Sequence, residues 1–461
     1  MRGTLQQLVK AIPGARLVGL DASFEGVSTD SRKVDAGALF VALVGETFDA
    51  HDFLDQVVAR NVAAVVVSRL PDGWTLPAIV VPDTLVALGR IAHAWRAQFA
   101  IPVIGVTGSN GKTTVKEMIA AILAASVGED ARLATQGNLN NEIGVPLTLF
   151  RLDASHRAAV VELGMNHPGE IGRLAAIATP TVGMVNNAQR EHQEFMHTVE
   201  AVARENGSVL QALAADGVAV FPGDDTYTDL WRGLSKCEVL TFGLSDACDV
   251  RATYAIGDFG SDLQVTTPGA QFNIKLAAAG EHNVRNALAA VACALGAGIE
   301  PAAIVRGLES FAPVGGRLQR KQAANGATVI DDTYNANPDS MRAAIDVLAA
   351  YPAPRILVVG DMGEVGAQGK EFHEEIGAYA VSRGIETVLA TGELARHLAA
   401  SGARHYEQFD ELLAALDEKL GGNASMTNLK ATVLVKGSRF MKMERVVQHL
   451  TGSTNIGKDA H

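Results

Sequence analysis

The chain has 461 residues, and its 39 lysines and arginines against 51 aspartates and glutamates give a net charge of -12. This acidic balance excludes a protein that binds nucleic acid by neutralising backbone phosphates. The length predicts about three domains, because a single hydrophobic core stops growing well below this size.

The sequence indicates a cytoplasmic protein without membrane insertion. Its N-terminus lacks the charged-then-apolar pattern of a signal peptide, and no apolar stretch approaches the ~20 residues that cross a bilayer. The three cysteines have neither metal-ligand spacing nor the even number of a disulfide framework, which is typical of reduced intracellular thiols.

Residues 1–84 are predicted to form a small α/β domain, because short β-rich runs alternate there with a helical pattern. One polar loop of this domain suits binding of a phosphate or a sugar, and it equally suits an ordinary turn. Its polar side chains are Ser28, Asp30, Ser31 and Arg32.

The central domain, predicted for 85–311, is organised around a glycine-rich loop. An apolar run at 103–107 has the length of a buried strand, and apolar residues return at helical spacing after the loop. A strand, a glycine turn and a helix in this order are typical of a phosphate-binding loop, so we expect ATP to bind here. The loop residues are Gly108, Ser109, Asn110, Gly111, Lys112, Thr113 and Thr114.

Two side chains of this loop can contact ATP and its Mg²⁺ ion. Lys112 can reach the β- and γ-phosphates, and the Thr113 hydroxyl can bind Mg²⁺. The strict motif has glycine where this chain has Val106, so an ordinary glycine turn beside a surface lysine is the alternative.

Two further apolar runs, 158–163 and 181–186, are predicted to be buried parallel strands. Because ligands bind outside the carboxyl ends of such strands, four polar residues should face the same crevice as Lys112. They are Glu162, Asn186, Asn187 and His192. A glutamate there can hold Mg²⁺ directly or through water. The alternatives are a solvated strand end and a structural histidine.

Three more segments complete the central domain. Residues 135–144 are dense in amide side chains, which indicates substrate recognition. A period of two at 263–276 predicts an antiparallel hairpin that flanks the central sheet. An alanine-rich helix is predicted for 286–297, with polar residues around its start that can hydrogen-bond a ligand.

Residues 312–461 are predicted to form a second doubly wound, Rossmann-like domain with a short polar tail from 451. Four apolar runs separated by helical patterns predict its parallel strands. Polar residues at the ends of these runs, among them 331–332, 360–361 and 436–439, form a rim that can close over the ATP site. The predicted fold is therefore α/β throughout, with three domains.

The polar segments of the chain form a set of motifs: Gly105 to Thr114, Thr135-x-Gly137-Asn138-x-Asn140-Asn141, Glu162-Leu163-Gly164-Met165-Asn166-His167, His282-Asn283-x-x-Asn286, Gly316-Arg317, Asp331-Asp332-x-Tyr334-Asn335-Ala336-Asn337-Pro338, Gly360-Asp361-Met362-Gly363-Glu364 and Lys436-Gly437-Ser438-Arg439. This set resembles the ATP-dependent Mur ligases of peptidoglycan synthesis over nearly the whole chain. The last three motifs are similar to those of the dipeptide-adding branch of that family.

The resemblance implies an amide ligase that uses ATP and Mg²⁺. The terminal carboxylate of UDP-N-acetylmuramoyl-tripeptide would first take the γ-phosphoryl group of ATP, because a free carboxylate reacts poorly with an amine. The amine of D-alanyl-D-alanine would then attack the acyl phosphate. We expect the enzyme to be a monomer.

The resemblance also implies a role for each candidate residue. The catalytic residues would be Lys112, Glu162 and His192, and the Mg²⁺ ligands would be Thr113, Glu162 and His192. We add Asn206 to the catalytic residues on its position in the chain, which differs from the family pattern as described below. Beyond the phosphate loop, the nucleotide would contact Asn286, Arg317 and Asp332. The UDP-sugar would contact Ser28, Asp30, Ser31, Arg32, Thr135, Asn138 and Asn141.

One position departs from the family pattern. Many Mur ligases have a lysine about fourteen residues after the Mg²⁺ histidine, and its carbamylated form supports a second Mg²⁺. In this chain that position is Asn206, which cannot be carbamylated. We expect Asn206 to hydrogen-bond in that space, or Glu205 or Glu200 to supply the missing anion, and ligation to be indifferent to bicarbonate.

Two other functions compete with this interpretation. A folylpolyglutamate synthase shares the central and C-terminal plan, but it does not account for the N-terminal domain. An ATP-dependent switch would use domain closure to signal to a partner protein, and its ATP turnover would be triggered by that protein.

Overall fold

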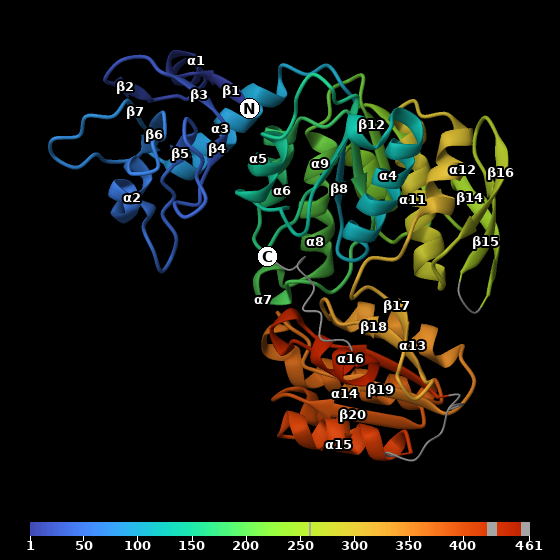
Figure 1. Ribbon diagram of the computed structural model, residues 1–461. Coiled ribbons are helices and arrows are strands. Elements are labelled where there is room, and N and C mark those ends of the chain that lie inside the picture. The colour runs from blue at the N-terminus through green and yellow to red at the C-terminus, as the bar shows by residue number, and fades with distance from the viewer. Residues whose placement is uncertain (258–259, 422–430, 453–461) are drawn as a thin grey trace.

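The structure is a computed structural model that describes residues 1–257, 260–421 and 431–452. Three sheets of five or more strands organise it, and Figure 1 shows their order from the N-terminal domain, through a large central domain, to the C-terminal domain beneath. Within the described ranges no helix is long and apolar enough to cross a membrane.

The N-terminal sheet has five strands in the order β2-β7-β6-β5-β4. Strands β4 to β7 are parallel, and β2 is antiparallel to β7. Successive strand residues point to opposite faces, so Phe40 packs toward α2 while Leu39 and Val41 join the cluster of α1 and α3. The elements are β1 (Arg2–Thr4), α1 (Leu5–Ala11), β2 (Arg16–Val18), β3 (Ser23–Glu25), β4 (Val27–Ser28), β5 (Leu39–Val41), η1 (Ala50–Phe53), α2 (Leu54–Val58), β6 (Ala64–Val67), β7 (Ala78–Val80) and α3 (Thr84–Arg96).

The central sheet has nine strands in the order β16-β15-β14-β13-β12-β11-β8-β10-β9. The seven strands from β14 to β9 in this order are parallel, and β15 and β16 form the predicted antiparallel hairpin at one edge. The strands are β8 (Val103–Thr107), β9 (Arg132–Ala134), β10 (Ala158–Glu162), β11 (Val182–Val185), β12 (Val218–Pro222), β13 (Glu238–Gly243), β14 (Val250–Ile256), β15 (Ser261–Thr266) and β16 (Gln271–Leu276).

Helices cover both faces of the central sheet. Ile104 and Val106 of β8 pack toward α4, α11 and α12, whereas Val103 packs toward α3, α5 and α6. A strand that is buried on both faces reads as an unbroken apolar run, which is why β8, β10 and β11 could be predicted. The helices are α4 (Lys112–Val127), η2 (Glu129–Ala131), α5 (Gly144–Leu149), α6 (Glu170–Ala178), α7 (Gln193–Met196), α8 (Val199–Asn206), α9 (Ser208–Gln211), α10 (Thr228–Leu234), α11 (Glu281–Gly296) and α12 (Pro301–Ser310).

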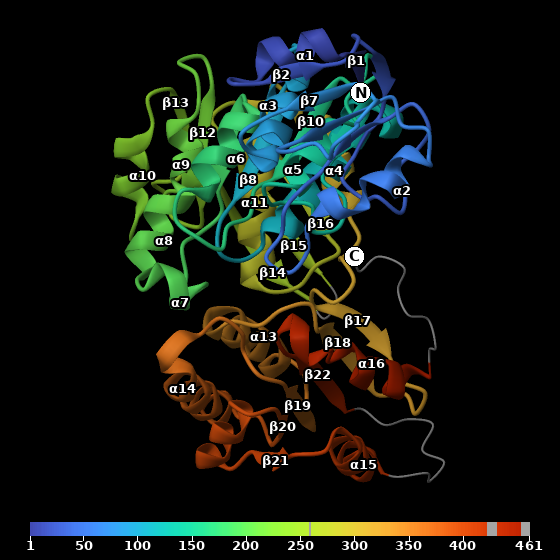
Figure 2. The ribbon, with the colours of Figure 1, turned by 90° about the vertical axis from the view of Figure 1, so that its left-hand side faces the viewer.

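The C-terminal sheet has six strands in the order β17-β18-β22-β19-β20-β21. Five of them are parallel, and β17 is antiparallel to β18. Helices α13 and α14 cover one face, and α15 and α16 cover the other (Figure 2). The elements are β17 (Gln319–Gln322), β18 (Thr328–Asp332), α13 (Pro338–Ala349), β19 (Arg355–Val359), η3 (Gly366–Gln368), α14 (Gly369–Ser382), β20 (Thr387–Thr391), η4 (Ala395–Ser401), β21 (Arg404–Tyr406), α15 (Phe409–Lys419), β22 (Thr432–Lys436), η5 (Arg439–Met441) and α16 (Glu444–Thr451).

The predicted α/β class with a doubly wound C-terminal domain is confirmed. The alanine-rich helix α11 begins at Glu281, five residues before its predicted start, so Asn286 lies within its second turn. Strands β17 and β21 were not predicted, because their polar sequences lack an apolar run. The predicted polar tail lies outside the described residues from 453 onward, and Thr451 closes α16.

Candidate active site

A cleft of about 850 Å³ lies between the central and C-terminal domains, at the carboxyl ends of β8, β10 and β11. The chain brings residues that are far apart in the sequence to its walls. Thirteen of the predicted site residues line it: Ser109, Asn110, Gly111, Lys112, Thr113, Thr114, Asn138, Asn141, Glu162, His192, Asn286, Arg317 and Asp332.

The phosphate loop joins the end of β8 to the start of α4 at Lys112. Gly111 has φ +80°, and a Cβ there would meet the Asn286 Oδ1 atom at 2.5 Å, so only glycine fits this position. Lys112 Nζ donates to the loop carbonyls of Gly108 and Ser109 and lies 3.3 Å from Glu191 Oε2. Strand, loop and helix therefore form as predicted, although Val106 departs from the strict motif.

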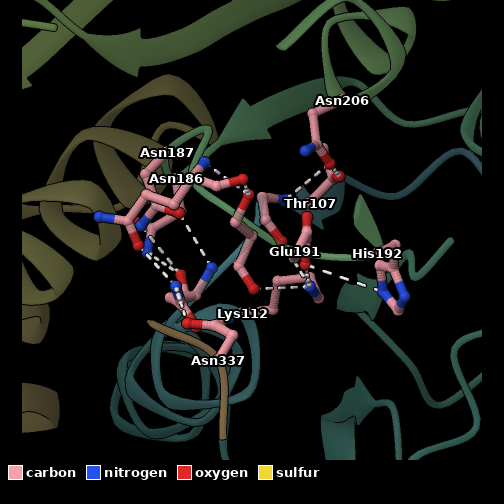
Figure 3. A network of polar contacts seen from close by, with 12 residues as sticks. Thr107, Lys112, Asn186, Asn187, Glu191, His192, Asn206 and Asn337 are labelled. Atoms are coloured by element: carbon pink, nitrogen blue, oxygen red, sulfur yellow. Dashed lines mark hydrogen bonds and ion pairs between the residues drawn. The ribbon is translucent and has the colours of Figure 1, made fainter. Parts of the chain in front are cut away.

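A network of amide side chains supports the loop (Figure 3). Asn187 binds both backbone groups of Asn110, because its Oδ1 accepts the N–H at 2.9 Å and its Nδ2 donates to the carbonyl at 3.0 Å. Asn186 Nδ2 donates to the same carbonyl at 2.8 Å and to Asn286 Oδ1 at 2.9 Å. From the C-terminal domain, Asn337 Nδ2 donates to Asn110 Oδ1 at 2.9 Å. The conformation of the loop is thus held by two domains.

Glu162 ends β10 as a buried carboxylate with one free oxygen. It is 2% exposed, and its Oε1 accepts a hydrogen bond from Asn140 Nδ2 at 2.8 Å. Its Oε2 is buried and has no hydrogen-bond partner among the described residues. Because a buried polar atom is normally satisfied, this oxygen indicates a place for a ligand.

Thr113, the other predicted oxygen ligand, faces a guanidinium. Arg317 Nη2 donates to Thr113 Oγ1 at 2.9 Å, and the Arg317 guanidinium lies 4.2 Å from the centre of the Tyr334 ring. This contact brings a positive charge from beyond the central domain to the first turn of α4, where the phosphate loop ends. Arg317 thus lies beside the phosphate loop, and its contact with the nucleotide stays a prediction.

His192 lies between two carboxylates. Its backbone is left-handed, with φ +46°, and its Nδ1 lies 2.6 Å from Glu364 Oε2 of the C-terminal domain. This close contact with His192 lowers the pKa of the Glu364 carboxyl. The other nitrogen, Nε2, lies 3.9 Å from Glu191 Oε2. Among the described residues no group of three histidines, cysteines or acids is assembled to hold a metal ion.

Asn206 lies beneath the phosphate loop, away from the lining of the cleft. It is 1% exposed, and its Oδ1 accepts hydrogen bonds from the Thr107 hydroxyl and, at 3.0 Å, from the Gly108 N–H. The side chain therefore supports the loop from behind, which limits its predicted catalytic role to positioning.

The two alternative anions suggested for this region are engaged elsewhere. Glu205 accepts backbone N–H groups of Gly169 and Ile171, both at 2.8 Å, and so caps α6. Glu200 pairs with Arg204 on the exposed side of α8, at 2.7 Å. The expectation that either carboxylate replaces a carbamate is wrong, because neither lines the cleft.

The predicted UDP-sugar residues fall into two groups. Asn138 and Asn141 line the cleft, and Asn141 Oδ1 also accepts the Gly144 N–H at 2.8 Å at the start of α5. Thr135 is 2% exposed, and its hydroxyl accepts the Glu162 N–H at 3.0 Å. The turn formed by Ser28, Asp30, Ser31 and Arg32 lies outside the cleft lining, in the N-terminal domain.

The N-terminal turn is held by its own polar groups. Arg32 contacts Asp30 through Nε at 2.9 Å and Nη2 at 3.1 Å, and Ser28 Oγ accepts the Asp30 N–H at 3.2 Å. The hydrogen bond from Arg32 lowers the pKa of the Asp30 carboxyl. Both interpretations of this loop, a turn and a sugar contact, stay open.

Only some residues of the predicted polar rim of the C-terminal domain line the cleft. Asp332 Oδ2 lies 2.6 Å from Lys436 Nζ, and both side chains are almost fully buried at the cleft wall. Asp361 points away from the cleft, because its oxygens accept the N–H groups of residues 393, 394 and 395. From the same loop it is Glu364 that lines the cleft, which corrects the predicted position of this rim.

Two charged residues beside His192 were missed from the sequence. Arg190 forms ion pairs with Asp339 at 2.6 Å and with Glu375 at 2.7 Å, and so joins the central domain to α13 and α14. Glu191 lines the cleft beside Lys112. The only sequence signal was their position in a loop that follows a buried parallel strand.

Comparison with known proteins assigns the family. Three family models match the chain: "Mur ligase family, catalytic domain" at 23–96, "Mur ligase middle domain" at 106–294 and "Mur ligase, glutamate ligase domain" at 316–439. The UDP-N-acetylmuramoyl-tripeptide–D-alanyl-D-alanine ligase of Escherichia coli K12 is 40% identical over 97% of this chain and 98% of its own length.

Solved structures agree with this assignment. The crystal structure of MurF from Acinetobacter baumannii is 35% identical, with a TM-score of 0.91 over 98% of this chain and 99% of that one. The MurF ligase of Thermotoga maritima in complex with ADP is 25% identical, with a TM-score of 0.83 over 93% of this chain and 97% of that one. The chain therefore belongs to the Mur ligase family, in the branch of the UDP-N-acetylmuramoyl-tripeptide–D-alanyl-D-alanine ligases.

Proposed function

We propose that the chain joins D-alanyl-D-alanine to UDP-N-acetylmuramoyl-tripeptide, with conversion of ATP to ADP and phosphate, in the cleft between the central and C-terminal domains. The observation that carries this proposal is that the phosphate-loop Lys112, the buried carboxylate Glu162 and Arg317 line one cleft. The names of the relatives supply the substrates, and the ADP complex of the Thermotoga relative supports the nucleotide.

The reaction needs an activated carboxylate, because a free carboxylate does not form an amide with an amine at a useful rate. One tripeptide carboxylate oxygen attacks the γ-phosphorus, and ADP leaves as the bond to the β,γ-bridging oxygen breaks. The dipeptide amine then attacks the acyl carbon, phosphate leaves and the nitrogen loses its extra proton. Positioning and charge neutralisation are the main contributions that a protein can make to these steps.

The residues of the cleft can supply that positioning. Lys112 would exchange its present contacts with the loop carbonyls for the β- and γ-phosphates of ATP. Arg317, already 2.9 Å from Thr113, would bring a second positive charge to the same phosphates. Asn286 and Asp332 would contact the remainder of the nucleotide from opposite walls.

The cleft also fits Mg²⁺. Thr113 offers a hydroxyl oxygen, and Glu162 offers a buried carboxylate oxygen with no hydrogen-bond partner among the described residues. These are the hard ligands that this ion prefers. The Nε2 atom of His192 lies 3.9 Å from Glu191 Oε2, beyond hydrogen-bond distance. When bound, the ion neutralises charge that develops on the transferring phosphoryl group.

The UDP-sugar would lie toward the amide-rich loop and the N-terminal domain. Asn138 and Asn141 can contact it from the cleft wall. Contacts with Thr135 and with the turn that holds Ser28, Asp30, Ser31 and Arg32 depend on how the substrate spans the two domains, so they stay predictions.

We further propose a cytoplasmic enzyme that acts as a monomer. The three cysteines are free thiols, which suits a reducing compartment.

The decisive test of the function is phosphate release with defined substrate pairs. Phosphate should form from ATP only when UDP-N-acetylmuramoyl-tripeptide and D-alanyl-D-alanine are both present. Release triggered by folate and glutamate, or by a protein partner without the sugar nucleotide, would contradict the proposal and support one of the two alternative functions.

Ligation should be indifferent to bicarbonate. Asn206 cannot be carbamylated, and its oxygen already binds the phosphate loop. The test compares ligation rates in CO₂-depleted buffer with and without added bicarbonate, and equal rates are expected. Marked activation by bicarbonate would show that a carbamylated lysine takes part.

Arg190 should control closure of the C-terminal domain. Arg190→Ala removes the ion pairs to Asp339 and Glu375, which join the central and C-terminal domains in this structure, so the variant loses two contacts that hold the domains together. Small-angle scattering should show compaction of the wild-type protein with a non-hydrolysable ATP analogue and UDP-sugar, and less compaction of the variant. Arg204→Ala, which removes an exposed pair on α8, is the control. Equal compaction of all three proteins would contradict this role.

A further inference from the structure

A buried carboxylate beside the phosphate loop has no part in the roles given above. Glu191 follows β11, is 7% exposed and lines the cleft. Figure 3 shows it between Lys112 and His192, with Oε2 lying 3.3 Å from Lys112 Nζ and 3.9 Å from His192 Nε2. The other oxygen, Oε1, is buried and has no hydrogen-bond partner among the described residues.

The surroundings of Glu191 are incomplete without a cation. A buried ionised carboxylate is costly unless its oxygens are paired, and Lys112 shares its donors with two loop carbonyls. When Lys112 turns to the phosphates of ATP, Glu191 loses this partner and faces additional negative charge. Glu162 presents a second unpartnered buried oxygen, Oε2, to the same cleft.

We propose that Glu191 is a further carboxylate ligand for the divalent cation that accompanies ATP, and that Oε1 is its ligand atom. This inference rests on the proposed function. Magnesium at nucleotide sites is held by one or two carboxylates together with phosphate oxygens and water. Glu191 and Glu162 would supply these two carboxylates, and phosphate oxygens would complete the set, since no group of three histidines, cysteines or acids is assembled in the described part of the chain.

The proposal also accounts for the neutral residue at position 206. Asn206 brings no charge, and its oxygen is taken by Thr107 and Gly108. Glu205 caps α6, and Glu200 lies on the surface. Glu191 supplies the negative charge from within the chain, so no CO₂-derived group is required.

The test measures cation binding directly. Mn²⁺, a paramagnetic substitute for Mg²⁺, is titrated into the protein with ADP, and free Mn²⁺ is followed by its electron paramagnetic resonance signal. Glu191→Gln should raise the Kd for Mn²⁺ by about 10-fold or more, because the loss of even an outer-shell partner of a metal ligand costs about 10- to 100-fold in affinity. Glu200→Gln removes an equal charge from the exposed face of α8 and should leave this Kd unchanged.

A second readout separates a cation ligand from a partner of Lys112. Without metal, Glu191→Gln should bind ADP as well as or better than the wild type, because Lys112 is released toward the phosphates. Weaker ADP binding with an unchanged Kd for Mn²⁺ would overturn the proposal and leave Glu191 as a support for Lys112 alone.

A measurement on the wild-type protein makes the test independent of the variant's folding. In crystals soaked with ADP and Mn²⁺, an anomalous peak should lie within coordination distance of Glu191 Oε1. A peak that contacts Glu162 and the phosphates but not Glu191 would overturn the inference while leaving the proposed function intact. A wild-type protein that binds no ADP with Mn²⁺ would instead count against the proposed function itself.

Discussion

Replacing Lys112 with alanine should abolish ligation while the protein stays folded. The variant removes the cation nearest to the γ-phosphoryl group, and loss of one such electrostatic contact costs about 10²- to 10³-fold in rate. Its present contacts are to two loop carbonyls and Glu191 at the edge of an open cleft, so water can replace them. The measurement is the ligation rate, together with the thermal midpoint and the circular dichroism spectrum.

The matched control is Lys370→Ala, which removes an exposed lysine paired with Glu374 on α14. It should keep the wild-type rate. Near-normal turnover by a folded Lys112→Ala protein would contradict the assignment of the phosphate loop, on which the remaining roles depend.

Replacing Asp332 with alanine should destabilise the C-terminal domain strongly. The variant leaves the ammonium of Lys436 without its partner at 2.6 Å, in a position where the lysine side chain is only 4% exposed. Breaking a buried ion pair by removing one partner costs about 3–5 kcal/mol. Scanning calorimetry should show the unfolding midpoint of this domain lowered by about 10 °C.

Asp346→Ala provides the comparison for stability, because its partner Arg383 is exposed and such a pair contributes about 1 kcal/mol or less. If both variants shift the midpoint equally, the Asp332–Lys436 pair is not the structural element described here. Because Asp332 also lines the cleft, nucleotide affinity has to be measured below the unfolding transition.

The phosphate loop and the long buried strands could be predicted from patterns of neighbouring residues in the sequence. The apolar run of β8, the loop glycines and the start of α4 all lie within 103–114, so no distant contact was needed to recognise them. The strand order of the C-terminal sheet was not predictable in this way. Strand β22 lies between β18 and β19 although it is the last strand in sequence, and this placement depends on packing of the whole domain.

The parts of the site that were misplaced depend on contacts between distant segments. Asn206 supports the loop because α8 lies beneath Gly108, about one hundred residues earlier in the chain. Asp361 was predicted to belong to the polar rim of the C-terminal domain. Its carboxylate instead accepts hydrogen bonds from the N–H groups of residues 393–395 and points away from the cleft. Glu191 lies 3.3 Å from Lys112, 79 residues earlier in the chain, and no local sequence pattern predicts this contact.

The fate of the tripeptide carboxylate oxygen tests the central claim most directly. UDP-N-acetylmuramoyl-tripeptide with an ¹⁸O-labelled terminal carboxylate is incubated with ATP, D-alanyl-D-alanine and the enzyme, and the products are analysed by mass spectrometry. Because the carboxylate oxygen attacks the γ-phosphorus, each phosphate released should carry one ¹⁸O atom from the peptide. Unlabelled phosphate with the lost ¹⁸O recovered in water, or release of pyrophosphate with the ¹⁸O recovered in AMP, would contradict phosphoryl transfer in this cleft.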